Sequence, residues 1–395
     1  MRRPHGLISD ASSRKICGPP SRSIYGVRSE GRVLLIITDF EIFPVEMPLD
    51  DKDWAFALAT VSSARGWGVR VTADGVQGYG YAPAVPHMGS TFEGLPIELT
   101  RFKPLVMGRD AFALEDLVAR LDRSLAGANQ AKAAIDCAVH DLQARALNQP
   151  LCNLLGGRLR TSIPVLRILA IKTPDEMAAK AGELFDEGYR YFKIKVHGDV
   201  QEDVARVRAI RQRLGAAAHL TIDANQSYWP KDAIYAINRM AEFGLDLVEQ
   251  PVPRHDLKGL ELVTRSVSVT VEADEGAGTL DEIAMLVSNR IVDAVSLKIP
   301  KLGGLRNAIA AARICESGGV RCRVGAHVGT RLLNAHAVHL ASALPIMEYA
   351  CEVGEFARMS GDPFTGLEVE NGYVAVPEVA GCGVSPVGDI QMMGS

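Results

Sequence analysis

The sequence predicts an α/β protein built on a (β/α)8 barrel, with a smaller α+β capping domain in front of it. Two observations support this prediction. From residue 163 onward, apolar runs rich in β-branched residues alternate with helical patterns in eight successive units. Charged residues recur near the ends of these runs at intervals of 24 to 28 residues, about one βα unit apart. Parallel strands in such a barrel end on the same face, so these charged side chains are expected to meet there.

The predicted barrel begins with a well-marked first unit. Thr173-Pro174-Asp175-Glu176 follows the first strand and predicts an N-cap, a proline at the first helical position and a capping box. Thr279-Leu280-Asp281-Glu282 predicts a second capping box. An open doubly wound sheet would instead carry a Gly-rich phosphate turn after its first strand, and none is present. The eight predicted strands are 163–171, 189–196, 219–225, 246–252, 269–275, 294–300, 321–327 and 346–352.

The residues before the barrel mix strands and helices, which indicates a small α+β domain. Its predicted strands are 34–46, 66–73 and 77–81, and its predicted helices are 110–126 and 131–148. Two loops, 48–65 and 82–96, are expected to cover the barrel mouth and to hold candidate substrate contacts in Trp54 and His87. The predicted division is a disordered extension (1–32), a capping domain (33–160), the barrel (161–370) and a C-terminal segment that returns to the capping domain (371–395).

Composition and charge exclude several classes of function. Hydrophobic residues make up 47% and charged residues 23% of the 395 residues, which is typical of a soluble globular protein. Residues 1–32 have a net charge of +5, so the rest of the chain, at net −9, is a poor binder of nucleic acid. No apolar run reaches transmembrane length, and the N-terminus lacks the apolar stretch of a secretory signal.

Cysteine usage indicates a reducing compartment. The chain has seven cysteines, an odd number, and no pair has CxxC spacing. A disulfide framework or a zinc knuckle is therefore not expected, and we predict a cytoplasmic protein.

The charged strand ends form a coherent set. Asp223, Glu249 and Asp274 end the third, fourth and fifth predicted strands, which are neighbours in the barrel. Three converging carboxylates would repel one another without a cation. A hard divalent ion with oxygen ligands, such as Mg2+, resolves that repulsion, and Mn2+ is a possible substitute. Asn225 and Glu275, which lie beside these ligands, are predicted to support them.

Lysines flank this predicted metal site. Lys193 and Lys195 end the second strand and Lys298 ends the sixth. Strands two and six are four apart in a ring of eight, so Lys195 and Lys298 face each other across the barrel. This geometry suits removal of a proton from one face of a carbon and its return to the other face.

Several motifs surround these charged residues: KIKVHGD (193–199), TIDANQSY (221–228), VEQPV (248–252), EADEG (272–276), SLKIPKLGG (296–304) and the joining segment 131–157. Together they resemble the motifs of the mandelate racemase/muconate lactonizing enzyme family in the enolase superfamily. The resemblance implies an enolase-type barrel modified at its closing strands. It also implies that Asp223, Glu249 and Asp274 bind the metal and that Lys195 and Lys298 are the acid/base pair. Lys193 would stabilise the substrate carboxylate, and lysines on both strands place the chain nearer the muconate lactonizing subgroup.

Two further residues are candidate substrate contacts. His327 ends the seventh strand, but the mandelate racemase subgroup pairs such a histidine with an aspartate on strand six, where this chain has Lys298. We therefore expect His327 to contact the substrate or to support the residues that do, with a purely structural histidine as the alternative. Glu352 ends the eighth strand and resembles the acidic group that family members present near the substrate carboxylate. Dipeptide epimerases of the family carry D-x-D on this strand, whereas Cys351-Glu352-Val353 stands here, which argues against a dipeptide substrate.

The expected function is a Mg2+-dependent racemase or epimerase that removes the α-proton of a small carboxylate substrate through an enediolate. A cycloisomerase or dehydratase of the same superfamily would use the same site with one lysine as acid. A third alternative is a metal-binding barrel without catalysis, against which the retention of both lysines and all three carboxylates argues. We expect no nucleic-acid or membrane partner and predict a homo-oligomer.

Overall fold

The computed structural model describes residues 27–28, 32–325 and 328–390. The chain divides into two compact units, residues 1–34 and residues 35–395. In the first unit, β1 (Val27–Arg28) pairs antiparallel with β2 (Arg32–Val33). No helix in the described ranges has the length and apolar character needed to cross a bilayer.

The second unit begins with a three-stranded antiparallel sheet in the order β3-β6-β7. The Asp74-Gly75 turn joins the last two strands, and both residues have the positive φ angles of a two-residue hairpin. Glycines bring this sheet close to helix α3, because a Cβ at Gly80 would lie 1.9 Å from the Ala134 carbonyl oxygen. The elements of this region are β3 (Asp39–Pro48), β6 (Ser63–Ala73), β7 (Val76–Pro83), α1 (Leu95–Val106), α2 (Leu114–Ser124), α3 (Asn129–Ala146) and α4 (Leu151–Leu154).

Two elements of this region differ from the predictions. The segment 48–65, predicted to be a loop, contains a small hairpin of β4 (Trp54–Phe56) and β5 (Ala59–Val61). Helix α1 was not predicted, although its buried residues Leu95, Leu99, Phe102 and Val106 share one face. This helix was missed because it contains Pro96 and Pro104, and proline disfavours the interior of a helix. A short 3-10 helix, η1 (Pro86–Met88), lies in the second predicted loop.

The barrel is a curled parallel sheet of seven strands in the order β15-β14-β13-β12-β11-β10-β9. Lys195 pairs with Asp223, and Asp223 pairs with Glu249, so these charged strand ends lie at one level. The fold class predicted from the sequence is confirmed. The strands are β9 (Leu166–Leu169), β10 (Tyr191–Lys195), β11 (His219–Asp223), β12 (Leu245–Glu249), β13 (Thr270–Ala273), β14 (Ala294–Leu297) and β15 (Arg321–Val324).

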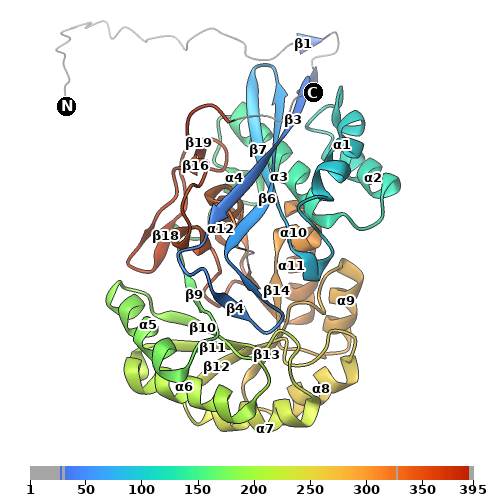
Figure 1. Cartoon of the computed structure of the whole chain (residues 1–395). Helices are drawn as coiled ribbons and strands as arrows, with labels where there is room; N and C mark the ends of the chain where they lie inside the picture. The colour runs from blue at the N-terminus through green and yellow to red at the C-terminus, as the bar shows by residue number, and fades with distance from the viewer. Residues whose placement is uncertain (1–26, 29–31, 326–327, 391–395) are drawn as a thin grey trace, which may run out of the picture. The chain divides into compact units, whose positions relative to one another are not determined.

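Helices surround the barrel strands, and Figure 1 shows α5 to α9 along the outer side of the sheet with the β4 hairpin between the barrel and the strands β3, β6 and β7. The Thr173 capping box is confirmed at the start of α5. The predicted box at Thr279 forms only in part, because the Glu282 carboxylate accepts from the Gly278 N–H instead. The helices are α5 (Pro174–Asp186), α6 (Val200–Leu214), η2 (Gly215–Ala217), α7 (Pro230–Ala241), α8 (Leu257–Ser266), α9 (Leu280–Ser288), α10 (Ile299–Leu302), α11 (Leu305–Gly318) and α12 (Arg331–Ala343).

The closing side of the barrel is irregular. The predicted eighth strand, 346–352, does not form a regular strand, and only isolated bridges join Met347 to Cys322 and Cys351 to Val165. The predicted first strand is divided, because β8 (Ser162–Pro164) pairs with β18 (Tyr373–Ala375) and only β9 joins the barrel sheet. Backbone bonds still close the gap, since the Cys351 N–H donates to the Pro164 carbonyl at 2.9 Å.

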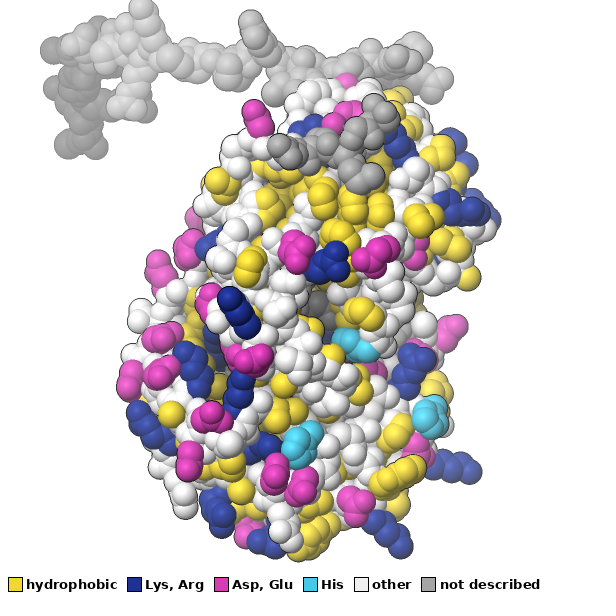
Figure 2. Space-filling view, in the orientation of Figure 1, with side chains coloured by type: hydrophobic (Ala, Val, Ile, Leu, Met, Phe, Trp, Pro, Cys, Tyr) yellow, Lys and Arg dark blue, Asp and Glu magenta, His cyan; other side chains and the backbone are white. Residues whose placement is uncertain are grey.

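The C-terminal residues pack along the joining helices. The Cys382 N–H donates to the Asp141 carboxylate on α3, and Gly381 forms a bridge with Pro150. This region also contains η3 (Glu355–Arg358), β16 (Phe364–Thr365), β17 (Val369–Glu370) and β19 (Ser385–Pro386). Positively and negatively charged side chains are interspersed over the face of the molecule that Figure 2 shows.

Candidate active site

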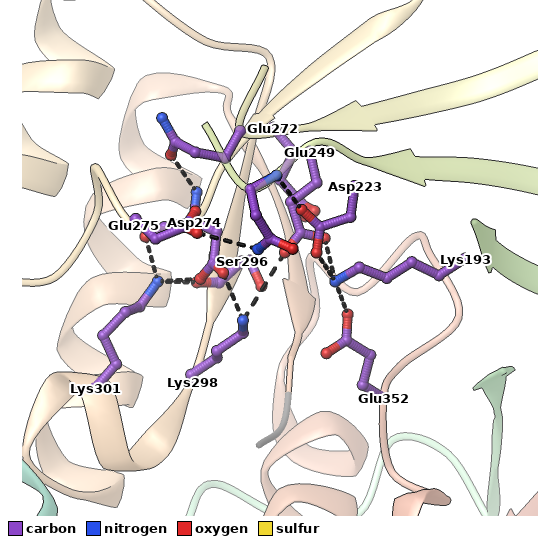
Figure 3. A network of polar contacts seen from close by, with 12 residues as sticks. Lys193, Asp223, Glu249, Glu272, Asp274, Glu275, Ser296, Lys298, Lys301 and Glu352 are labelled. Atoms are coloured by element: carbon purple, nitrogen blue, oxygen red, sulfur yellow. Dashed lines mark hydrogen bonds and ion pairs between the residues drawn. The ribbon is translucent and has the colours of Figure 1, made fainter. Parts of the chain in front are cut away.

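The predicted metal ligands and lysines converge at the carboxyl ends of the barrel strands. Lys193, on β10, is buried, and its Nζ lies 2.9 Å from Asp223 Oδ2, 2.7 Å from Glu249 Oε2 and 2.6 Å from Glu352 Oε1. Figure 3 shows Lys193 reaching this cluster from one side while Lys298 and Lys301 reach Asp274 from the other. The Lys193 ammonium therefore lies against three buried carboxylates and offsets part of their negative charge.

The two candidate acid/base lysines each contact one of the outer carboxylates. Lys195 Nζ lies 2.5 Å from Asp223 Oδ2 and 2.8 Å from Asn225 Oδ1. Lys298 Nζ lies 2.5 Å from Asp274 Oδ2 and 3.9 Å from Glu249 Oε1. Strands β11, β12 and β13 separate the strands that carry the two lysines, so the lysines flank the carboxylates on opposite sides.

Both lysines line one cavity of about 330 Å³ between the barrel and the capping elements. Its polar floor also includes Lys193, Asn225, Asp274 and Glu352. Its opposite wall is largely apolar and comes from the β4–β5 hairpin, η1 and Val328; Trp54, Phe56, Leu58, Val61, His87 and Met88 line it. The predicted contacts Trp54 and His87 thus lie at the same cavity as the lysines.

Opposing effects set the ionisation of this cluster. Burial raises the pKa of Asp223 and Asp274, but the neighbouring lysines outweigh burial and hold both pKa values below the ordinary range. Burial lowers the pKa of Lys298, but Asp274, Glu249 and Glu352 outweigh it and raise that pKa. Glu249 behaves differently, because burial and the nearby Asp223 raise its pKa even though Lys193 opposes them.

The donor set fits a hard divalent cation. Asp223, Glu249 and Asp274 offer only carboxylate oxygens, all in fully buried side chains, which is the chemistry that Mg2+ prefers. Glu249 Oε1 has no hydrogen-bond partner among the described residues, as expected for an oxygen that serves a ligand. Within the same residues the carboxylates do not form a ready-made cage, since ammonium groups lie against their oxygens.

Sequence reasoning missed a buried arginine on the seventh strand. Arg323 is 1% exposed and forms ion pairs with Glu249 and with Glu272, the residue that precedes Asp274 by two on the fifth strand. Burial raises the pKa of Glu272 to about 8, although Arg323 lowers it. Both residues could have been found from the alternation of side chains along a strand. Arg323 and Glu272 lie an even number of residues from the predicted site residues of their strands and therefore point to the same side.

Two more polar residues that sequence analysis did not assign hold Asp274 in place. Lys301, on the short helix α10, donates to the Asp274 carboxylate at 2.8 Å and to its carbonyl oxygen at 2.6 Å. The Gln250 side-chain oxygen accepts from the N–H groups of Asp274 and Gly276, both at 3.0 Å. Gln250 itself has a φ of +37°, an uncommon conformation for this residue type that marks a constrained strand end.

The remaining predicted residues divide into three cases. Asn225 accepts from Lys195 and donates to Glu275, whose pKa burial and the charges of Asp274 and Asp223 raise to about 7. Glu352 is buried against Lys193, and although burial opposes it, Lys193, Lys298 and Arg323 lower its pKa to about 2. His327 lies outside the described residues.

A capped (β/α)8 barrel with acidic ends on three neighbouring strands and lysines on both sides defines an enolase-type barrel. Family models agree with this class. Residues 38–156 match the mandelate racemase / muconate lactonizing enzyme N-terminal domain, and residues 176–390 match the enolase C-terminal domain-like model. The chain belongs to the mandelate racemase/muconate lactonizing enzyme family of the enolase superfamily and is an enzyme of that superfamily.

Individual relatives catalyse different reactions. The chain is 35% identical over 336 residues to a hydrophobic dipeptide epimerase of Enterococcus faecalis, covering 84% of this chain and 95% of the relative. It is 34% identical over 323 residues to a chloromuconate cycloisomerase of Cupriavidus necator, covering 80% and 87%. The crystal structure of a dipeptide epimerase from Enterococcus faecalis, complexed with Mg and the dipeptide L-Leu-L-Tyr, is similar with a TM-score of 0.86 and 33% identity, covering 89% of this chain and 100% of that one.

Proposed function

We propose that the protein is a Mg2+-dependent racemase or epimerase that inverts the carbon next to a carboxylate. The observation that carries this proposal is the placement of Lys195 and Lys298, which line one cavity from opposite sides of the three carboxylate-bearing strands. A single base would need only one of them. Two opposed proton carriers suit a reaction in which the proton leaves one face and returns to the other.

The chain's own residues divide the work as follows. The Nζ of one lysine, as a neutral amine, takes the α-proton, and the Nζ of the other, as an ammonium, delivers a proton to the opposite face. Lys193 contacts the substrate carboxylate and offsets its charge, because Lys193 is part of the polar floor of the cavity. A divalent cation held by Asp223, Glu249 and Asp274 would offset the negative charge that raises the pKa of Lys298 and stabilise the charge that develops on the substrate carboxylate.

The cavity wall supports a substrate with an apolar substituent. The β4–β5 hairpin contributes Phe56, Leu58 and Val61 on the side opposite the lysines. We infer that the substrate is an N-substituted amino acid with an apolar group against this hairpin. The strand-eight residues Cys351-Glu352-Val353 lack two aspartates that could hold a free ammonium group, so we rank N-acyl amino acids above dipeptides.

Cycloisomerisation is the second candidate. The similarity to a chloromuconate cycloisomerase favours it, because such a reaction can use the same carboxylates and one lysine as acid. Its product would be a lactone ring instead of an inverted centre, so product analysis separates the two candidates.

One experiment tests both. The protein is incubated in D2O with Mg2+ and, in separate reactions, N-acyl amino acids, hydrophobic dipeptides, hydroxyprolines, sugar acids, and muconate or chloromuconate, followed by proton NMR and chiral chromatography. We expect α-proton exchange together with inversion for an N-acyl amino acid. Lactone formation without inversion would replace the proposal by cycloisomerisation, and inversion of dipeptides alone would correct the substrate class.

A further inference from the structure

A second cavity, of about 430 Å³, lies behind strand β9 and under the loop that leads into β4. Ile168 and Trp54 line both this cavity and the candidate active site, so their side chains form the partition between the two. Arg167 precedes Ile168 on β9 and therefore points to the opposite face of the strand, away from the barrel interior. The proposed reaction uses none of the polar groups in this second cavity.

The floor of this cavity carries an excess of buried positive charge. Arg167 is 8% exposed and Arg358, in η3, is 7% exposed, yet Glu355 is the carboxylate that both approach. Arg358 forms an ion pair with Glu355, whereas Arg167 Nη1 remains 3.9 Å from Glu355 Oε1. Two buried guanidinium groups thus face one buried carboxylate, whereas the other acidic residues of the cavity, Asp50, Asp51 and Glu176, lie at its more exposed edge. Buried charges in proteins are normally paired.

Several donor atoms at this floor are unused. Arg167 Nε and Nη1, and Arg358 Nε and Nη2, are buried and have no hydrogen-bond partner within the described part of the chain, and neither do the two carboxylate oxygens of Glu355, which pairs with Arg358 only as an ion pair. Burial is the largest influence on the pKa of Arg358 and lowers it; Arg167 lowers it further, whereas Glu355 and Asp51 raise it. A planar guanidinium group binds oxyanions through paired N–H donors. The unused arginine N–H groups could therefore donate to the oxygens of a bound oxyanion.

The mouth of the cavity links it to the hairpin over the active site. Lys172 lies at the edge, where its Nζ bonds to the Asp51 carboxylate at 3.3 Å and to the Asp53 carbonyl oxygen at 3.0 Å. The Arg358 guanidinium stacks 4.4 Å above the ring of Trp54, the first residue of β4. A ligand that fixes Arg358 would therefore also fix one end of the hairpin.

We propose that this cavity is a binding site for a small oxyanion, a carboxylate or phosphate group, held by Arg167 and Arg358 and separate from the substrate site. The ligand neutralises the charge that Glu355 leaves unbalanced and completes the hydrogen bonds of both guanidinium groups. This site does not depend on the proposed reaction, because its ligand need not reach the lysines.

The test is isothermal titration calorimetry of the full-length protein with inorganic phosphate and with malonate, at constant ionic strength set by chloride. We expect saturable binding in the millimolar range or tighter for at least one anion, and the ratio of the two affinities identifies the favoured group. Absence of saturable binding of both anions would overturn the proposal.

Variants locate the binding. Arg167→Met should weaken it at least tenfold, and Glu355→Gln should tighten it, because the competing carboxylate is gone. The exposed-arginine control Arg239→Met and the active-site variant Lys298→Met should both leave it unchanged. Loss in Lys298→Met would place the anion in the active site and contradict the proposal. If circular dichroism shows that Arg167→Met is unfolded, the Glu355→Gln variant tests the proposal in its place. Anion binding by Glu355→Gln that is unchanged or weaker would contradict the proposed site.

Discussion

Single residues separate the two candidate reactions, because Lys195 and Lys298 sit on opposite sides of the same three carboxylate-bearing strands. For a racemase, Lys195→Ala and Lys298→Ala should each lower inversion by about 10²–10⁴-fold, since both a base and an acid are required. Each variant should still exchange the α-proton of one enantiomer with D2O, and the two variants should prefer opposite enantiomers. Exchange by NMR and inversion by polarimetry measure the two effects separately.

The control for these variants is Lys231→Ala, which removes an exposed lysine of α7 and should keep full turnover. Full turnover in one active-site variant with loss in the other would indicate one-base chemistry and favour the cycloisomerase. Normal inversion in both would contradict the assignment of the site.

The three carboxylates predict metal dependence. Chelation by EDTA should reduce turnover to background, and Mg2+ or Mn2+ should restore it. Mg2+ should also stabilise the native state, by about 2.7 kcal/mol at a concentration a hundred times the dissociation constant, which thermal unfolding detects without any substrate. Asp223→Asn should lose this thermal response. The control Glu242→Gln, which removes an exposed carboxylate, should keep it. Full turnover after chelation would show that the site does not need the ion.

The convergence of the principal candidate site residues could be predicted from the sequence, because these residues follow the period of the βα unit. Asp223, Glu249 and Lys298 could be placed on one face by counting units along the chain. Arg323 and Gln250 could not be assigned in this way. The contacts of Arg323 join strands 74 and 51 residues apart, and Gln250 acts through its side chain on a neighbouring strand. Such roles depend on side-chain direction, which spacing alone does not give.

Secondary-structure elements were predictable where local signals agree with the fold. The Thr173 capping box and the Asp74-Gly75 turn are encoded within a few residues and form as expected. The closing strand was not predictable, because the apolar run 346–352 has two possible partners and makes only isolated bridges. β8 similarly leaves the barrel for β18, a segment about 210 residues later in the chain. Non-local pairing of this kind leaves no local pattern.

Asp141 illustrates how elements far apart in sequence are joined. Its buried carboxylate accepts from the Tyr79 N–H on β7 at 3.0 Å, from the Cys382 N–H at 2.7 Å and from Arg145 Nε at 2.9 Å. Asp141→Asn replaces an acceptor by an amide N–H2 and leaves Arg145 without its counter-charge. We expect a loss of about 3–5 kcal/mol in the free energy of unfolding, as for other broken buried pairs.

Urea unfolding followed by circular dichroism measures this loss. The control is Asp116→Asn, which removes an exposed carboxylate from α2 and should leave the unfolding midpoint unchanged. An unchanged midpoint in Asp141→Asn would show that the three bonds do not stabilise the junction.

At the scale of the whole molecule, the division into residues 1–34 and 35–395 predicts where the chain can be shortened. The first 32 residues carry no apolar period, and the active-site residues all belong to the second unit. A protein that begins at Val33 should therefore keep its thermal midpoint and its turnover. Loss of folding or of activity in this truncation would show that the extension is structural.

A truncation that is five residues longer should lower the thermal midpoint, in contrast to the truncation at Val33. Leu35 is 1% and Ile37 0% exposed, and their N–H groups donate to Asp110 Oδ1 and to the Arg109 carbonyl oxygen. Burial of two such side chains contributes roughly 3–6 kcal/mol, so a protein that begins at Thr38 should unfold at a distinctly lower temperature. Because neither Arg109 nor Asp110 lines the cavity that holds the lysines, the turnover of the molecules that remain folded should be unchanged. Calorimetry on the two truncations, with turnover corrected for the folded fraction, tests this boundary to within five residues. Equal midpoints for the two proteins would place the start of the folded unit after Ile37.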